Sequence, residues 1–254
     1  MVELAGIVLA AGAGTRLRPL TTVRPKALCT VAAVALVDHA IGRLRQLTPS
    51  IAVNVHYQPD AMLSHLSRRP VHVSHEKEAA LGSSGALGFL KDWIGGRAVL
   101  VTNADTWMAD GLRSFFEGWD GVRTRLLVEP NTERPDFDGR WRYVGAALMP
   151  WTDVAGLSAE FGGLYSQRWR DRHAAGLVEF LPATGKCVPC DTPAEYLHAN
   201  LVATDGGNSV EAGATIEGAV QRSVIWADAS VKSDESLVEA VRANDDLTLY
   251  PFRP

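Results

Sequence analysis

The segment from Gly6 to Lys26 carries the residue types that bind and transfer phosphate groups. A short apolar run leads directly into Ala11 to Gly14, whose small side chains let several backbone amides turn toward one point. Arg16 and Lys26 follow on a proline-stiffened loop. Preorganised cations stabilise the charge that accumulates on phosphate oxygens during substitution at phosphorus. The segment therefore predicts phosphoryl or nucleotidyl transfer, with Arg16 and Lys26 as catalytic residues.

Two other glycine-rich phosphate motifs do not fit this segment. Leu17 stands where the dinucleotide-binding pattern G-x-G-x-x-G has its third glycine, which disfavours a nucleotide-dependent dehydrogenase. No G-K-[ST] follows the glycines, so a P-loop is excluded. What is left is a glycine turn followed by an arginine and a lysine.

Short apolar runs alternate with helix-like spacing over the first 150 residues, and this pattern positions the glycine turn. Such alternation predicts right-handed βαβ units, hence an α/β fold with a Rossmann-like, mostly parallel sheet and helices on both faces. Ligands bind at the carboxyl ends of strands in such a sheet, where the glycine turn lies. The expected strands are Leu4 to Ala10, Ile51 to Val55, Val71 to Ser74, Ala98 to Thr102, Arg125 to Glu129 and Tyr143 to Met149.

The pattern changes after helix-like segments at 164–175 and 193–203. Val210 and Ile216 are six residues apart, and small residues and a glycine follow each of them. This spacing predicts one or two coils of a left-handed, hexapeptide β-helix with both side chains pointing inward. An irregular glycine-rich tail is the alternative. We expect a domain at residues 1–205 and a short tail at 206–254, which could pair two subunits as a homodimer.

The run GAGTRLRPLTTVRPKAL resembles the signature of the sugar-1-phosphate nucleotidylyltransferases, which join a nucleoside triphosphate to a sugar 1-phosphate and release pyrophosphate. The resemblance extends with gaps to about residue 203. It implies that the glycine turn holds the triphosphate and that Arg16 and Lys26 contact phosphate. The nucleotide-binding residues of the first strand and turn would be Leu9, Ala10, Ala11, Gly12, Ala13, Gly14 and Thr15.

Two later segments also resemble this family. LGSSGAL at 81–87 is similar to a loop and helix start that approaches the nucleobase and ribose. This implies nucleotide contacts at Gly82 and Ser83, and it places Gly82 and Gly85 where a side chain would block the base. TNADTW resembles an N-G-D motif after the central strand. It implies that Asn103 contacts the nucleotide and that Asp105 is catalytic as a ligand of Mg²⁺.

A second metal-binding aspartate of the family is replaced here. In VPCDTPAEYLHAN, Pro189 occupies its aligned position, while Asp191 stands where the family has a glycine. Either Asp191 reaches the Mg²⁺ from a shifted backbone, or Asp105 holds the ion with waters and phosphates. A helix N-cap is the structural alternative for Asp191.

The family resemblance is less complete at the residues expected to bind the sugar phosphate. The segment from Tyr143 to Gly145 resembles an F-x-G segment of the sugar pocket, which implies a role for Gly145. The family lysine that meets the sugar phosphate is not evident. We expect Arg142 to replace it, with Arg134 and Arg140 as alternatives.

The composition limits the functional classes. The chain has 254 residues, 25 Lys+Arg and 29 Asp+Glu, which gives a formal net charge of −4 and disfavours a nucleic-acid-binding protein with a basic face. No apolar stretch approaches the roughly 20 residues of a membrane helix, so we expect a cytoplasmic protein without a membrane partner. Cys187 and Cys190 form an isolated C-x-x-C, which favours two thiols over zinc or a redox pair.

The sequence therefore predicts a sugar-1-phosphate nucleotidylyltransferase that uses Mg²⁺, a nucleoside triphosphate and a sugar 1-phosphate. The resemblance of HEKEAALGSSGAL to guanylyl- and uridylyl-transferring members favours GTP slightly, with a uridylyl or thymidylyl donor as the alternative. A catalytically silent regulatory or nucleotide-binding homologue is a further alternative, which Pro189 favours.

Overall fold

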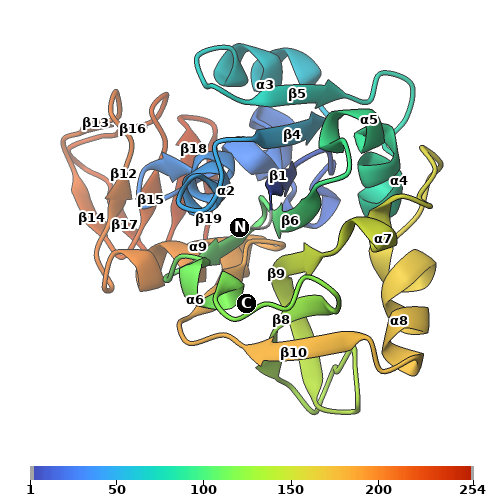
Figure 1. The fold of residues 1–254 in the computed structure, drawn as a ribbon. Coiled ribbons are helices and arrows are strands. Elements are labelled where there is room, and N and C mark those ends of the chain that lie inside the picture. The colour runs from blue at the N-terminus through green and yellow to red at the C-terminus, as the bar shows by residue number, and fades with distance from the viewer. Residues whose placement is uncertain (1–2, 253–254) are drawn as a thin grey trace.

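A seven-stranded sheet forms the centre of the computed structural model, which describes residues 3–252. Its strand order is β10-β8-β9-β6-β1-β4-β5 (Figure 1). β9 runs antiparallel to both neighbours, and all other adjacent pairs are parallel, which confirms the predicted mostly parallel sheet. The strands are β1 (Leu4–Leu9), β4 (Ile51–Val55), β5 (His72–His75), β6 (Ala98–Asn103), β8 (Thr124–Pro130), β9 (Trp141–Met149) and β10 (Val178–Pro182).

Helices connect most of these strands. They are α1 (Leu20–Val23), α2 (Leu36–Arg45), α3 (Pro59–Leu66), α4 (Gly82–Phe89), α5 (Lys91–Ile94), α6 (Arg113–Phe116), α7 (Trp151–Val154), α8 (Arg170–Ala174) and α9 (Pro193–Ala203). The helix expected at 164–175 is a π-helical segment, Tyr165–Trp169, followed by α8. Among residues 3–252, no helix has the length and apolarity needed to cross a membrane.

Side chains of the sheet alternate between two hydrophobic cores, one on each face. On β1, Leu4 and Val8 belong to one core, while Ala5 and Ile7 belong to the other. Residues of α2 and α3 complete the first core, and residues of α4 and α5 complete the second. Burial on both faces explains why the strands are continuous apolar runs in the sequence.

A small antiparallel pair lies outside the main sheet and joins two distant segments. β7 (Thr106–Met108) follows β6, and it pairs with β11 (Cys187–Pro189) so that Pro189 lies opposite Thr106. The Cys190 amide donates to the Asp105 carbonyl at 2.9 Å, which extends the pairing. The pairing therefore brings Asp105 close to the residues that follow β11.

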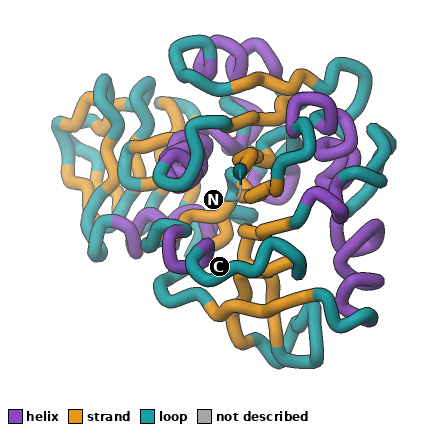
Figure 2. Tube along the Cα trace, viewed as in Figure 1, coloured by secondary structure: helices purple, strands orange, loops and turns teal. Residues whose placement is uncertain are grey.

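The tail consists of short strands stacked in rows (Figure 2), all of them parallel except β19, which pairs antiparallel with β18. β12, β15 and β18 form one parallel row, β13 and β16 a second, and β14 and β17 a third. The strands are β12 (Ser209–Val210), β13 (Thr215–Ile216), β14 (Ala219–Gln221), β15 (Val224–Ile225), β16 (Ser230–Val231), β17 (Ser236–Val238), β18 (Val241–Asn244) and β19 (Leu247–Leu249).

The predicted burial of Val210 and Ile216 is wrong. Their side chains are 40% and 39% exposed, whereas their register partners Ile225 and Val231 are fully buried. Val210 and Ile216 lie on β12 and β13, which each pair on one side only. Among residues 3–252, no further strand covers them on the open side, because β12 and β13 are the first strands of their rows.

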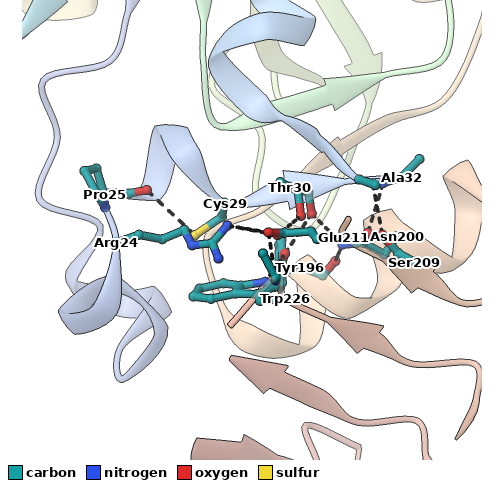
Figure 3. Close-up of polar contacts among 12 residues, drawn as sticks. Arg24, Pro25, Cys29, Thr30, Ala32, Tyr196, Asn200, Ser209, Glu211 and Trp226 are labelled. Carbon is teal, nitrogen blue, oxygen red and sulfur yellow. Dashed lines mark hydrogen bonds and ion pairs between the residues drawn. The ribbon is translucent and has the colours of Figure 1, made fainter. Parts of the chain in front are cut away.

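The tail packs against the loop that carries Lys26 (Figure 3). Arg24 Nη1 donates to both carboxylate oxygens of Glu211, at 2.9 and 3.1 Å, and the guanidinium lies 3.8 Å from the centre of the Trp226 ring. Glu211 also accepts from Thr30 Oγ1 at 2.7 Å and from the Ala227 amide at 3.1 Å. We call these five residues the anchor cluster.

A shared hydrophobic core accompanies this contact. It unites Leu17 and Leu20 of the signature loop with Tyr196 and Leu197 of α9 and with Trp226 of the tail. Trp226 Nε1 also donates to Tyr196 Oη at 3.0 Å (Figure 3). The short strands β2 (Thr30–Val31) and β3 (Val34–Ala35) lie at this junction. The division at residue 205 stays a prediction.

Candidate active site

The glycine turn begins where β1 ends at the edge of the sheet. Asn54 Oδ1 accepts a hydrogen bond from the Ala10 amide at 2.7 Å and so fixes the exit of the chain from the strand. Ala11, Gly12 and Ala13 donate to no protein acceptor among the described residues. Their amides are therefore free to bind an anion.

Gly14 folds the turn back onto the loop that follows. Its φ is +59°, and a Cβ at this position would lie 2.8 Å from Lys26 Cβ and 2.9 Å from Thr21 Cγ2. Thr21 Oγ1 donates to the Gly14 carbonyl at 2.9 Å and holds the turn there. Glycine is required because both the left-handed backbone and the close approach exclude a side chain.

The turn and the β7–β11 pair place one ammonium between two carboxylates. Lys26 Nζ donates to Asp105 Oδ2 at 2.8 Å and to Asp191 Oδ1 at 2.5 Å. Arg16 Nη2 lies 3.0 Å from Asp191 Oδ2. We call these four residues the site cluster. The structure thus brings together the three predicted catalytic residues and the proposed second metal ligand.

Exposure differs sharply within the site cluster. The Lys26 side chain is 9% exposed and that of Asp191 17%, whereas those of Asp105 and Arg16 are 38% and 71% exposed. Burial alone lowers the pKa of Lys26, but the charges and hydrogen bonds of Asp105 and Asp191 outweigh it, so the pKa is raised. Lys26 is therefore a permanent cation at neutral pH.

Asp191 is not the N-cap of α9, which was one of the two sequence interpretations. Thr192 caps the helix: its Oγ1 accepts from the Glu195 amide at 3.2 Å, while Glu195 Oε2 accepts from the Thr192 amide at 2.9 Å. This capping box leaves the Asp191 carboxylate free to face Lys26. Pro189, at the aligned aspartate position, lines a cavity together with Asp191, but its side chain has no ligand atom.

A cavity of about 200 Å³ lies on one side of the site cluster. Arg142 and Gly145, the residues expected on the sugar-phosphate side, line it together with Asp105 and Asp191. Gly145 has a φ of +94°, and a Cβ there would lie 3.0 Å from Thr106 Oγ1. Arg134 and Arg140, the alternatives to Arg142, are not among the described residues that line this cavity.

A second cavity of about 260 Å³ lies on the other side, and Asn103 and Asp105 line both cavities. Six of the ten predicted nucleotide-binding residues line it: Leu9, Ala11, Gly12, Gly82, Ser83 and Asn103. The other four, Ala10, Ala13, Gly14 and Thr15, belong to the strand exit and turn but not to its described lining. The two cavities therefore meet at Asp105.

Comparison with known proteins identifies the family of the chain. Residues 5–121 match the family model described as nucleotidyl transferase. Over 190 residues, 68% of this chain and 79% of the relative, the chain is 32% identical to an N-acetylmuramate alpha-1-phosphate uridylyltransferase of Neisseria meningitidis serogroup B. The chain belongs to the nucleotidyl transferase family.

Two further comparisons concern the sequence and the fold of this nucleotidyl transferase. The chain is 42% identical over 145 residues to an N-acetylmuramate alpha-1-phosphate uridylyltransferase of Caulobacter vibrioides; the match covers 52% of this chain and spans only 60% of that relative's length. A Thermus thermophilus structure described as a mannose-1-phosphate geranyltransferase superposes with a TM-score of 0.69 at 15% identity, covering 98% of this chain and 95% of that one. The second match shows a similar fold that includes the tail.

The donor set of this nucleotidyl transferase fits a hard cation. Asp105 and Asp191 supply carboxylate oxygens, and Mg²⁺ needs only one or two protein carboxylates because it keeps waters and binds substrate phosphates. Among the described residues, no group of three or more His, Cys, Asp or Glu side chains forms a metal site. The thiols are poor ligands here: burial raises the pKa of Cys187 to about 11 and that of Cys190 further.

The sequence interpretation of two glycines was incomplete. A Cβ at Gly82 would lie 2.4 Å from the Gly162 carbonyl oxygen, and one at Gly85 would lie 2.2 Å from the Glu160 carbonyl oxygen. Substitution at Gly85 would therefore clash with the loop that packs on α4 instead of with a bound base. Gly82 meets this loop as well, although it also lines the cavity.

Sequence reasoning missed a buried polar network behind the nucleotidyl transferase site. Asn54 Nδ2 donates to Glu76 Oε1 at 2.8 Å, and the Leu81 amide donates to Glu76 Oε2 at 2.8 Å. Asn54 and Glu76 are 3% and 2% exposed. Together with the Ala10 contact, they connect the strand exit to the segment that starts α4. The polar Asn54 in the otherwise apolar run IAVNV was the available signal.

Proposed function

We propose that this chain is a sugar-1-phosphate nucleotidylyltransferase, which transfers a nucleoside monophosphate from a nucleoside triphosphate to a sugar 1-phosphate and releases pyrophosphate. The observation that supports it best is the position of the site cluster, with Lys26 held between Asp105 and Asp191 where two cavities meet. Two substrates whose phosphates react with each other require such a junction. The triphosphate would occupy the Gly12 side and the sugar phosphate the Gly145 side.

The proposed reaction is an in-line attack by a sugar-phosphate oxygen on the α-phosphorus of the triphosphate. A new phosphorus–oxygen bond forms as the bond from the α-phosphorus to the oxygen that bridges the α- and β-phosphates breaks, and pyrophosphate leaves with the electron pair. No general base is needed, because a phosphate monoester is already an anion near neutral pH. Arg16 and the free amides of the glycine turn would neutralise the leaving pyrophosphate, and Lys26 would hold the incoming phosphate.

Mg²⁺, held by Asp105 and Asp191, would supply further charge neutralisation between the two substrates. Before substrate binding, Lys26 holds both carboxylates at the junction through its two hydrogen bonds. The side chains are therefore organised before the ligands arrive, which lowers the cost of assembling the reactive arrangement.

We propose UTP as the first donor to test, in place of the GTP that the sequence favours. The support is that the relatives from Caulobacter and Neisseria are both named uridylyltransferases. GTP and dTTP are the alternatives. N-acetylmuramate 1-phosphate is, for the same reason, the first sugar phosphate to test.

The test is a panel of UTP, GTP, dTTP, ATP and CTP against several sugar 1-phosphates with Mg²⁺, scored by pyrophosphate release. We expect one donor to be turned over, and Arg16→Ala and Asp105→Ala to abolish most of that turnover. The exposed Arg68→Ala and Asp234→Ala variants serve as matched controls. Wild-type turnover in either site variant contradicts the proposal.

A nucleotide-binding homologue without catalysis is the second candidate, and Pro189 favours it because that position has no carboxylate. Asp191 supports catalysis instead, since its carboxylate reaches Lys26 from a position two residues later. Nucleotide binding without pyrophosphate release on the whole panel is the outcome expected of a silent homologue.

The tail gives rise to a separate proposal. We propose that it is a short left-handed β-helix whose open first coil, with Val210 and Ile216 exposed, pairs two subunits. Light scattering of the purified chain tests this: a dimer that Ile216→Asp converts to a monomer supports it, and a wild-type monomer refutes it.

A further inference from the structure

The loop between α7 and the π-helical segment lies against the start of α4. The Ser84 amide donates to the Gly162 carbonyl at 3.1 Å, and the Gly162 amide donates to the Leu81 carbonyl at 3.0 Å. Ser83 Oγ accepts from the Leu164 amide at 2.9 Å. These bonds fix the backbone on the carboxyl-terminal side of Phe161.

Three glycines of α4 let the loop approach this closely. A Cβ at Gly82, Gly85 or Gly88 would lie 2.4, 2.2 or 2.1 Å from a carbonyl oxygen of the loop. The oxygens belong to Gly162, Glu160 and Ser158, respectively, so the contact continues on the amino-terminal side of Phe161. The loop is thus held on both sides of this residue.

Phe161 is nevertheless 81% exposed. Phe161 lines the 260 Å³ cavity together with Gly12, Gly82 and Ser83. Covering a large apolar ring that is exposed to water lowers the free energy, so a ligand that packs on it is favoured. The cavity contains the phosphate-binding turn at Gly12, so the group that reaches Phe161 is the part of a nucleotide remote from its phosphates.

We propose that the ring of Phe161 stacks on the nucleobase of the bound triphosphate. This inference rests on the proposed function and adds a binding residue to it. Aromatic rings stack on purines and pyrimidines alike, because every base has a π face. Phe161 therefore contributes affinity for all bases, and the choice among bases comes from other contacts.

Phe89 provides a matched control. It is a phenylalanine at the end of α4, it is 52% exposed, and it is not among the described residues that line the nucleotide cavity. Truncation of Phe89 removes a similar ring from the same region without touching the proposed base site. Both truncations are expected to leave the melting temperature near that of the wild type.

Isothermal titration calorimetry of the full chain with Mg²⁺ tests the inference, using UTP, GTP and inorganic tripolyphosphate as probes. We expect Phe161→Ala to weaken binding of the nucleotide that the wild type binds by about 5- to 150-fold. Tripolyphosphate has no base, so its affinity stays unchanged. Phe89→Ala leaves all affinities unchanged, and Phe161→Trp retains nucleotide binding and shows an added tryptophan fluorescence that the nucleotide quenches.

The outcomes separate the two proposals. If the wild type turns over or binds a nucleotide and Phe161→Ala binds it equally well, stacking is refuted and the proposed function stands. If Phe161→Ala weakens tripolyphosphate as much as nucleotide, the residue acts on the fold of the loop and stacking is again refuted. A wild type that binds no nucleotide and releases no pyrophosphate refutes both.

Discussion

Two ionic clusters lie two residues apart on the signature loop, and they differ in how completely they are satisfied. In the anchor cluster, Arg24 binds Glu211, whose two oxygens also accept from Thr30 and Ala227, and Trp226 covers the guanidinium. The side chains of Arg24 and Glu211 are 18% and 11% exposed. The Arg24–Glu211 pair of the anchor cluster is therefore largely covered by the protein.

The site cluster is open on the side that faces the cavities. Lys26 is as buried as the anchor residues, but its partner Asp105 is 38% exposed, and Arg16 is 71% exposed. Lys26 contacts only Oδ2 of Asp105, and this carboxylate lies where the two cavities meet. The comparison teaches that similar charge pairs serve different ends: a closed cluster fixes the loop to the tail, and an open one can exchange partners with substrate.

The largest expected effect is the loss of activity in Lys26→Met. Removal of the ammonium leaves two carboxylates facing each other and takes away the cation that steadies the incoming phosphate. We expect turnover to fall by roughly 100- to 1,000-fold, the cost of losing one preorganised electrostatic contact in other enzymes. Steady-state pyrophosphate release measures this, with the exposed Lys77→Met as the control. Activity within a few-fold of wild type would place Lys26 in a purely structural role.

Alkaline pH is expected to remove the same contact reversibly. The pKa of Lys26 is raised because the two carboxylates outweigh its burial, so the ion pairs contribute stability that is fully present below the unfolded value of about 10.4. That stability is lost as the pH rises through the raised folded pKa. The melting temperatures of wild type and Lys26→Met should therefore differ at pH 8 and converge at the alkaline limit. A constant difference across this range contradicts the assignment.

The glycine turn, Arg16, Lys26, Asp105 and the central sheet could be predicted from sequence, because their positions follow from local patterns and from the rule that parallel strands end at one edge. The anchor cluster could not, since 187 residues separate Arg24 from Glu211. The sequence leaves the role of Asp191 open for a related reason. Its position depends on the pairing of β7 with β11, whose three-residue strands carry little pattern of their own.

Glu211→Gln should lower stability more than activity, the reverse of what we expect for Lys26→Met. The amide keeps the shape but leaves the Arg24 guanidinium without its counter-charge, which we expect to cost about 1–3 kcal/mol of folding stability. Turnover should fall by less than about tenfold, through kcat rather than KM, because the loop that carries Lys26 loses its attachment to the tail. Denaturant unfolding and steady-state kinetics check both parts, with Glu217→Gln on the exposed surface as the control. A loss of turnover well above tenfold would mean that the anchor cluster takes part in the reaction.

The smallest effect on stability is expected at the start of α9, where a structural residue and a proposed metal-binding residue are adjacent in the chain. Thr192→Ala removes the side-chain half of the capping box and should cost about 1 kcal/mol of stability while activity stays near wild type. Asp191→Asn should leave stability nearly unchanged or lower it slightly, since Lys26 retains Asp105, yet reduce turnover by roughly 100-fold. Thermal unfolding and pyrophosphate release on both variants measure the contrast. A lower activity in Thr192→Ala than in Asp191→Asn would mean that activity depends on the position of α9 and not on the carboxylate of Asp191.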